Sequence, residues 1–189
     1  TRAAVGEDIE ILVDANCGFT APVALKLGRF LEEYRVWHFE EPLADYELEA
    51  MAELASHLDI AVAAGEQRYN RWDFQELIEK GKVDIIQPDI VKSGGFTESK
   101  KIAVLGDLYG KPLTLHCSQP TLGFIANLHF QIATPGCRYY QEHLIEEHPL
   151  QEVFFKEAPV VKNGRFKPLE RPGLGVELNE KALKKYETG

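Results

Sequence analysis

Residues 36–42, VWHFEEP, are a short apolar run closed by two carboxylates and a proline, and this form decides the fold because it recurs. One repeat earlier, the run 9–13 is followed by Asp14, and one repeat later the run 60–64 leads to Glu66. Segments with helical spacing of apolar residues follow these runs, at residues 22–34, about 46–58 and 72–79. Short strands that alternate with helices predict β/α units around a parallel sheet.

The same alternation continues toward residue 150. Further apolar runs occur at residues 83–86, 113–115 and 138–140, and helices are expected from 94–95 to about 109 and near 123–133. Gly81 is expected to end the third helix with a positive φ. We therefore expect an α/β fold with about six β/α units in residues 1–150. Residues 151–189 are expected to add a hairpin around Asn163-Gly164 and a helix at 179–186, within one domain.

Six ionisable residues stand at the ends of the six predicted strands, at intervals of 26, 26, 23, 27 and 26 residues: Asp14, Glu40, Glu66, Asp89, His116 and Glu142. The carboxyl ends of parallel barrel strands meet on one face, where active sites lie. A single carboxylate at such a place is often only a helix cap or a solvated loop group. Six of them in register predict one site.

Asp14, Glu40 and Glu66 are hard oxygen donors, which suit Mg²⁺ because that ion binds a few carboxylates and keeps positions for water or substrate. Without a cation, three like charges would raise one another's pKa values. Asp89 and His116 end neighbouring strands, so they form a candidate acid/base pair; the alternative is a buried histidine satisfied by a carboxylate. His38 lies two residues before Glu40, where a packing role is expected.

The composition excludes several kinds of partner. The formal charge of −9 and the isoelectric point near 5.2 argue against nucleic acid and anionic membranes. The sequence contains no run of about 18 apolar residues, so it predicts no membrane-spanning helix. The three cysteines have no paired spacing, which indicates reduced thiols and a cytoplasmic protein.

The motifs VDAN (13–16), FEEP (39–42), AGEQ (64–67), QPDIVKSGG (87–95), LHCSQPT (115–121) and PGLGVE (172–177) resemble the mandelate racemase subgroup of the enolase superfamily, in order and over nearly the whole chain. The resemblance implies an incomplete TIM-type (β/α) barrel. Residues 1–189 would be a fragment of the C-terminal catalytic domain, with about six of eight β/α units and without the N-terminal α+β capping domain and the strand that carries an opposing lysine.

The resemblance also implies roles for single residues. Asp14, Glu40 and Glu66 become Mg²⁺ ligands, Asp89 and His116 the acid/base dyad, and Glu142 a hydrogen-bond partner of the substrate carboxylate or its enediolate. Asn16 matches a position near substrate or metal. Lys92 matches a catalytic lysine of the muconate-lactonising subgroup, or else only shields the carboxylates.

The implied reaction is Mg²⁺-dependent removal of the proton α to a carboxylate through an enediolate, in an acid-sugar dehydratase. The alternatives are a 2-hydroxy-acid racemase or epimerase, a lactonising enzyme that uses Lys92, and an inactive barrel fragment with a structural role. The implied partner is a small carboxylate substrate, and the full-length protein is expected to be a homo-oligomer.

Overall fold

The sheet of the computed structural model, which describes residues 1–118, 121–145, 154–157, 160–167 and 169–187, has four parallel strands. Their order along the sheet is their order in the chain: β1 Ile11–Asp14, β2 Val36–Glu40, β3 Ala61–Ala64 and β4 Ile85–Ile86. Asp14 pairs with Glu40, and Glu40 with Ala63. The predicted α/β fold with a parallel sheet is confirmed, and its first strand-end carboxylates lie side by side.

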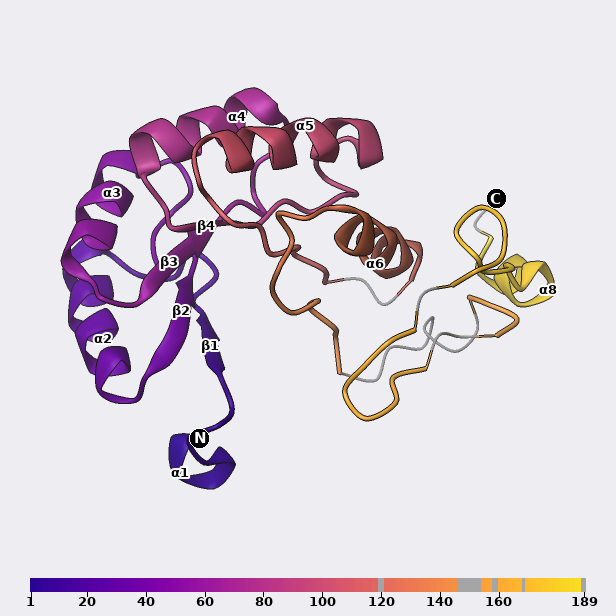
Figure 1. Ribbon diagram of the computed structural model, residues 1–189, viewed down its shortest axis with the longest axis horizontal. Helices are drawn as coiled ribbons and strands as arrows, with labels where there is room; N and C mark the ends of the chain where they lie inside the picture. The colour runs from indigo at the N-terminus through magenta and orange to yellow at the C-terminus, as the bar shows by residue number, and fades with distance from the viewer. Residues whose placement is uncertain (119–120, 146–153, 158–159, 168, 188–189) are drawn as a thin grey trace.

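Helices cover the outer face of the sheet (Figure 1). They are α2 Ala21–Glu33, α3 Leu48–His57, α4 Arg71–Glu76 with the π-helical turn η1 Leu77–Gly81, and α5 Gly95–Leu108. A short helix, α1 Arg2–Val5, precedes β1. Strands and helices together form an arc, with the helices on its outer side and the strands on its inner side (Figure 1).

The third helix ends in a way that the sequence did not predict. Gly81 is the last residue of η1 and does not have a positive φ; the left-handed residue is Lys82, with φ 50°. A Cβ on Gly81 would lie 3.1 Å from Leu48 Cδ2 and 3.2 Å from Leu77 Cδ1. The glycine is needed for close packing against α3, so the expectation about its φ was wrong.

The fifth and sixth expected strands are not regular strands in the described residues. Leu113 forms one isolated parallel bridge with Ile86, and Thr114 N donates to Ile86 O at 3.1 Å. Residues 138–140 form no strand; instead the Tyr139 ring lies 4.4 Å from that of Trp37 on β2. These two segments therefore do not extend the regular hydrogen-bonded sheet that the sequence predicted.

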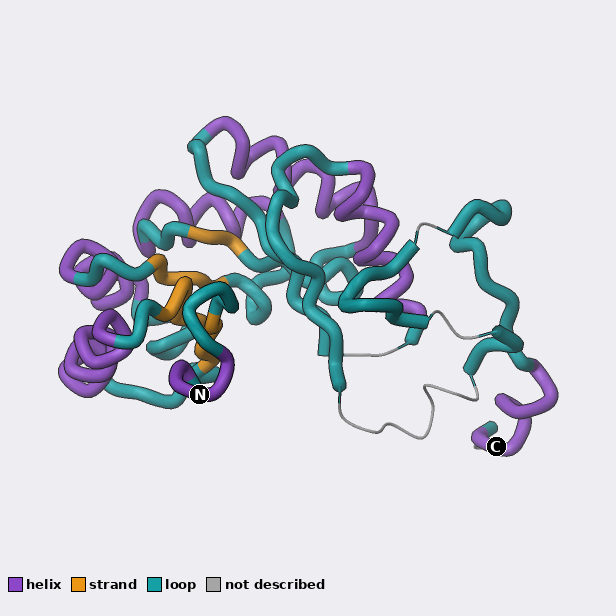
Figure 2. Tube along the Cα trace, turned by 60° about the horizontal axis from the view of Figure 1, so that its bottom comes forward, coloured by secondary structure: helices purple, strands orange, loops and turns teal. Residues whose placement is uncertain are grey.

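Described residues of the C-terminal part pack against α6 Leu122–Ala133, and Figure 2 gives a second view of the whole chain. Phe124, Ile125 and Phe155 form a small core there with Cys117. The predicted turn is present: Lys162 pairs with Arg165 across Asn163 and Gly164, whose φ values are 53° and 69°. The predicted last helix is α8 Glu180–Leu183 followed by the 3-10 turn η2 Lys184–Tyr186.

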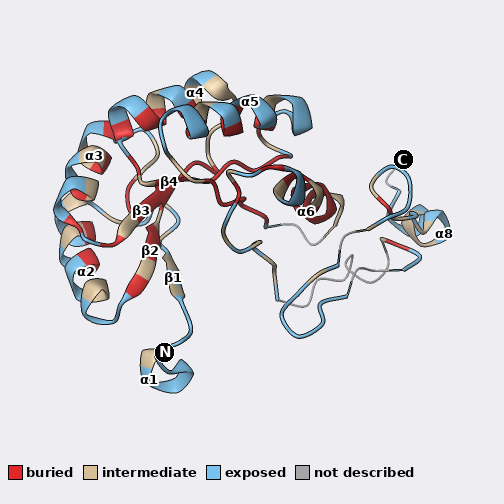
Figure 3. Cartoon of the chain, in the orientation of Figure 1, coloured by how far each residue is buried: buried red, intermediate tan, exposed pale blue. Residues whose placement is uncertain are grey.

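Burial increases across the sheet from β1 to β4 (Figure 3). Leu12 on β1 is 42% exposed, whereas Phe39, Val62 and Ile86 on the next three strands are fully buried. The main core lies between the sheet and the helices α2 to α5. In the described part of the chain, no helix is long and apolar enough to cross a membrane.

Candidate active site

The strand ends of β1, β2 and β3 carry the three carboxylates expected to hold a metal. Asp14 ends β1 and is exposed, Glu40 ends β2 and is partly buried, and Glu66 follows β3 by two residues and is 8% exposed. Asn16 N donates to Asp14 Oδ1 at 2.7 Å, and Gln67 Nε2 donates to Glu66 Oε1 at 3.0 Å. The three acids therefore stand at one edge of the sheet.

Their electrostatics indicate a shared negative site. The pKa of Asp14 is raised by partial burial and further by the charges of Glu40 and Glu66, although the bond from Asn16 N opposes the change. Among the described residues, no group of three His, Cys, Asp or Glu side chains is placed to hold a metal ion together. Mg²⁺ does not require one, because it binds through one or two carboxylates and keeps water ligands. The donor chemistry fits Mg²⁺, which Asp14, Glu40 and Glu66 would hold.

The Asp89–His116 pair is formed. His116 Nδ1 lies 2.9 Å from Asp89 Oδ2, and both residues are buried. Asp89 Oδ1 accepts from Val91 N at 2.7 Å and from Lys92 N at 3.3 Å. These two backbone bonds fix the carboxylate, which in turn orients the imidazole ring.

The other ring nitrogen of His116 contacts Glu66, a candidate metal ligand: Nε2 lies 2.9 Å from Glu66 Oε2. Burial alone would lower the pKa of His116, but its hydrogen bonds to Asp89 and Glu66 raise it to about 10. Burial would raise the pKa of Glu66, and the bond from His116 and the nearby Lys92 charge outweigh that effect and lower it. In this state His116 is an imidazolium held between two carboxylates.

Glu142 reaches the same site from the sixth segment. Cys117 N donates to its Oε2 at 2.5 Å. Glu142 is exposed as a whole residue, but partial desolvation of its carboxyl group raises its pKa. The charges of Glu40 and Glu66 act in the same direction, and the bond from Cys117 N and the charge of His116 oppose it. A raised pKa favours a protonated acid that can donate a hydrogen bond.

Lys92 and Asn16 lie at the margin of the site. Lys92 Nζ is 3.7 Å from Glu66 Oε1, a long ion pair that fits the shielding role considered from the sequence. Asn16 is exposed and its backbone, with φ 43°, caps Asp14. Next to it, Cys17 (φ 59°) donates from Sγ to the buried Glu41 Oε2 at 3.2 Å.

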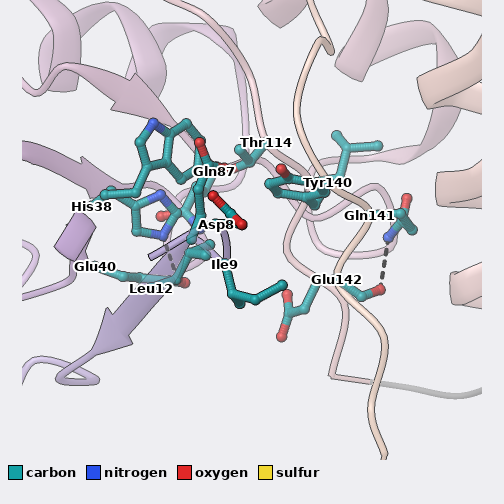
Figure 4. A pocket seen from close by; sticks show the side chains of 13 residues that line it. Asp8, Ile9, Leu12, His38, Glu40, Gln87, Thr114, Tyr140, Gln141 and Glu142 are labelled. Carbon is teal, nitrogen blue, oxygen red and sulfur yellow. Dashed lines mark hydrogen bonds and ion pairs between the residues drawn. The ribbon is translucent and has the colours of Figure 1, made fainter. Parts of the chain in front are cut away.

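A cavity of about 410 Å³ is lined by side chains of β1, of β2 and of the segment after β4 (Figure 4). Glu40 and Glu142 stand on opposite sides of it. Its other polar walls include His38, Gln87 and Thr114. The cavity extends from the strand ends, at Glu40, toward residues that come earlier in the strands, such as His38.

Sequence reasoning missed several contacts of this site. Gln67 was quoted within a motif but given no role, and the Cys117 backbone donor has no sequence signal. Asn127 Nδ2 donates to His116 O at 2.8 Å from α6, a contact between distant segments. Thr114 could have been found by the period of two that placed His38 below Glu40, because it precedes His116 by two residues.

Comparisons with known proteins agree with this geometry. The family model described as enolase C-terminal domain-like matches residues 1–182. An arabinonate dehydratase of Saccharolobus solfataricus is 37% identical over 185 residues, which are 98% of this chain and 49% of that protein. A solved enolase-superfamily member from Salmonella Typhimurium has a TM-score of 0.90 and 32% identity, covering 97% of this chain and 47% of that one.

A third relative carries a metal. The L-talarate/galactarate dehydratase of Salmonella typhimurium LT2, solved with Mg and L-lyxarohydroxamate, has a TM-score of 0.85 and 31% identity over 97% of this chain and 44% of its own. This chain thus spans about half the length of the relatives that it matches.

Proposed function

The chain belongs to the enolase C-terminal domain-like family, and from this membership we propose that it forms the catalytic half of a Mg²⁺-dependent acid-sugar dehydratase. The observation that carries the proposal is the Asp89–His116 pair, at 2.9 Å, beside the strand-end carboxylates. The substrate class is supported by two relatives, the arabinonate and L-talarate/galactarate dehydratases.

In this proposal Asp14, Glu40 and Glu66 hold the metal. When bound, Mg²⁺ supplies positive charge that stabilises the carboxylate of the substrate as its α-proton is removed. Burial is the main cause of the raised pKa of Asp14, and the charges of Glu40 and Glu66 add to it. A cation among the three acids would relieve both effects, which supports this assignment.

His116 moves protons. Asp89 holds the Nδ1 hydrogen and directs Nε2 away from itself, so Nε2 is the atom that exchanges a proton with substrate. The imidazolium form described above can protonate a departing β-hydroxyl. To act as a base, His116 must first lose that proton, which becomes easier when Glu66 turns its charge toward a cation.

Glu142 and Asn16 bind substrate in the same proposal. A protonated Glu142 donates a hydrogen bond to the substrate carboxylate, and its bond from Cys117 N keeps it in place. Lys92 stays near Glu66 as an electrostatic partner.

The proposed substrate is a small carboxylate, and the proposed full-length protein is a homo-oligomeric enzyme of the cytoplasm. The free thiols of Cys17 and Cys137 are consistent with a reducing compartment.

A 2-hydroxy-acid racemase or epimerase is the second candidate, because one histidine–aspartate pair can both remove and return an α-proton. The two reactions differ in their products. A racemase exchanges the α-proton with solvent and keeps the hydroxyl groups, whereas a dehydratase releases water and forms a 2-keto-3-deoxy acid.

The test is a library of acid sugars assayed for 2-keto-3-deoxy products and, in D₂O, for exchange at the α-carbon. We expect dehydration of at least one member, reduced by about 100-fold or more in His116→Asn. His57→Asn, on the exposed face of α3, is the matched control. Dehydration that is equal in His116→Asn and the control would contradict the proposal, and exchange without dehydration would favour the racemase. Neither reaction in the intact protein would favour the inactive structural fragment.

A further inference from the structure

Three buried polar side chains lie one layer below the strand-end residues, and we call them the polar floor: His38, Gln87 and Thr114. Each precedes a strand-end residue by two positions, namely Glu40, Asp89 and His116, so each faces the same side of its segment. Their exposed fractions are 1%, 4% and 7%. All three line the 410 Å³ cavity, where Figure 4 labels them.

The polar floor has unsatisfied hydrogen-bonding groups. Within the described residues, neither ring nitrogen of His38, nor Gln87 Oε1, nor Thr114 Oγ1 has a hydrogen-bond partner. A buried donor or acceptor that stays unpaired destabilises the folded state, because it has lost its water partners. Buried polar groups that share one roomy cavity are the usual setting for ordered water.

His38 is also the side chain brought to Glu40. Its Nε2 lies 3.5 Å from Glu40 Oε2, close enough for electrostatic attraction and too far for a good hydrogen bond. The other two candidate metal ligands have closer hydrogen-bond donors. Asn16 N lies 2.7 Å from Asp14 Oδ1, and Gln67 Nε2 lies 3.0 Å from Glu66 Oε1. Carboxylates that bind metals are normally oriented by such donors.

We infer that His38 is a positioning residue for the Glu40 carboxylate, and that water on the polar floor binds its second ring nitrogen. This inference rests on the proposed function, because it takes Glu40 as a metal ligand. A hydrogen on Nε2 points toward Glu40 Oε2, 3.5 Å away, and a small shift of either side chain would complete the hydrogen bond. Nδ1 then accepts from water, which can also donate to Gln87 Oε1 and accept from the Thr114 hydroxyl.

The inference separates two effects of removing the ring nitrogens. His38→Phe keeps a ring of similar size and its packing against Trp37, whose ring centroid is 4.8 Å away, but it has no donor. His38→Gln keeps an amide donor near the position of Nε2. A packing role requires the ring, whereas a positioning role requires the donor.

The test is Mg²⁺ affinity, measured by calorimetry on the intact protein without substrate, together with urea unfolding. We expect His38→Phe to bind Mg²⁺ about 10-fold or more weakly, and His38→Gln to stay within about 3-fold of the wild type. His57→Gln on α3 is the matched control. Equal Mg²⁺ affinity in His38→Phe and the wild type, or equal loss in His38→Phe and His38→Gln when both are folded, would overturn the inference.

The water is tested separately. In a crystal structure of the intact protein we expect ordered water within hydrogen-bond distance of His38 Nδ1, and we expect Thr114→Val to weaken Mg²⁺ binding less than His38→Phe does. A dry polar floor overturns this part. A wild-type protein that binds no Mg²⁺ overturns the proposed metal site itself, a result distinct from failure of the His38 variants alone.

Discussion

His116 Nε2 lies 2.9 Å from Glu66 Oε2, so the residue expected to move protons contacts a residue expected to bind metal. Glu66 Oε2 cannot form its full interaction with the His116 ring and with a metal ion at the same time. The charge of His116 and the occupation of the metal site are therefore linked: a cation that attracts Glu66 weakens its hold on the imidazolium.

The first prediction concerns pH and Glu66→Gln in metal-free protein. The folded pKa of His116, about 10, is above the ordinary 6.5, so this group contributes stability that is complete below pH 6.5 and is lost as the pH rises toward 10. Glu66→Gln removes one of its two carboxylates, so the pKa falls and less stability is lost over that range. Urea unfolding near pH 6.5 and pH 9.5 with a chelator measures the difference.

Glu49→Gln, an exposed change on α3, is the control and should behave as the wild type. An NMR titration of His116 gives the pKa directly. If the titration midpoint is the same in Glu66→Gln and the wild type, the coupling inferred from the contact is wrong. Addition of Mg²⁺ to the wild type should lower the midpoint in the same direction as the substitution.

The second prediction concerns Asp89→Asn. The asparagine oxygen can still accept from Val91 N and Lys92 N, but its amide does not hold the Nδ1 hydrogen of His116 as a carboxylate does. We expect kcat for dehydration to fall by about 10²–10⁴ with little change in KM. The unfolding free energy should also fall at neutral pH, because the hydrogen bond that raises the pKa of His116 is lost. A variant that is folded at the assay temperature and keeps the wild-type kcat would contradict a role for Asp89 in proton transfer.

The third prediction separates strain from hydrogen bonding at Cys17. Both Cys17→Ala and Cys17→Gly remove the thiol that donates to Glu41, but only alanine keeps a side chain at φ 59°. We expect the glycine variant to be more stable than the alanine variant by about 1 kcal/mol. Urea unfolding of both variants tests this; a less stable glycine variant would mean that the left-handed backbone carries no strain.

The sequence predicted the parts of the fold that depend on local pattern. The runs that end at Asp14, Glu40 and Glu66 gave β1 to β3 within two residues at each end, because apolar runs bounded by turn residues are a strong local signal. The fifth run, residues 113–115, forms only one bridge, Leu113 with Ile86, and is not a regular strand.

The site was predictable in its members but not in its contacts. Strand-end spacing brought Asp89 and His116 together, as the structure confirms. The turn of Glu66 toward His116 depends on side-chain rotamers in two segments about 50 residues apart, for which the sequence has no period. Likewise, the helix continues through Gly81 and its left-handed end lies one residue later, at Lys82, a shift of one position that helix-ending rules do not resolve.

The last prediction concerns the charge state of Glu142. Burial raises the pKa of its carboxyl group, and the negative charges of Glu40 and Glu66 act in the same direction, against the bond from Cys117 N and the charge of His116. If the acid donates to the substrate carboxylate, glutamine can replace it, because an amide also donates and can still accept from Cys117 N. Leucine has a similar volume and can do neither.

We therefore expect Glu142→Gln to keep kcat/KM within about 10-fold of the wild type and Glu142→Leu to lose about 100-fold or more, in keeping with the cost of an unpaired polar group at a binding site. The pH dependence of kcat/KM distinguishes a protonated from an ionised Glu142. Deprotonation of Glu142 should lower kcat/KM as the pH rises in the wild type, and this decrease should be absent in Glu142→Gln, which has no proton to lose. A glutamine variant as poor as leucine would show that the ionised carboxylate is the working form, with Glu142 accepting a hydrogen bond from the substrate.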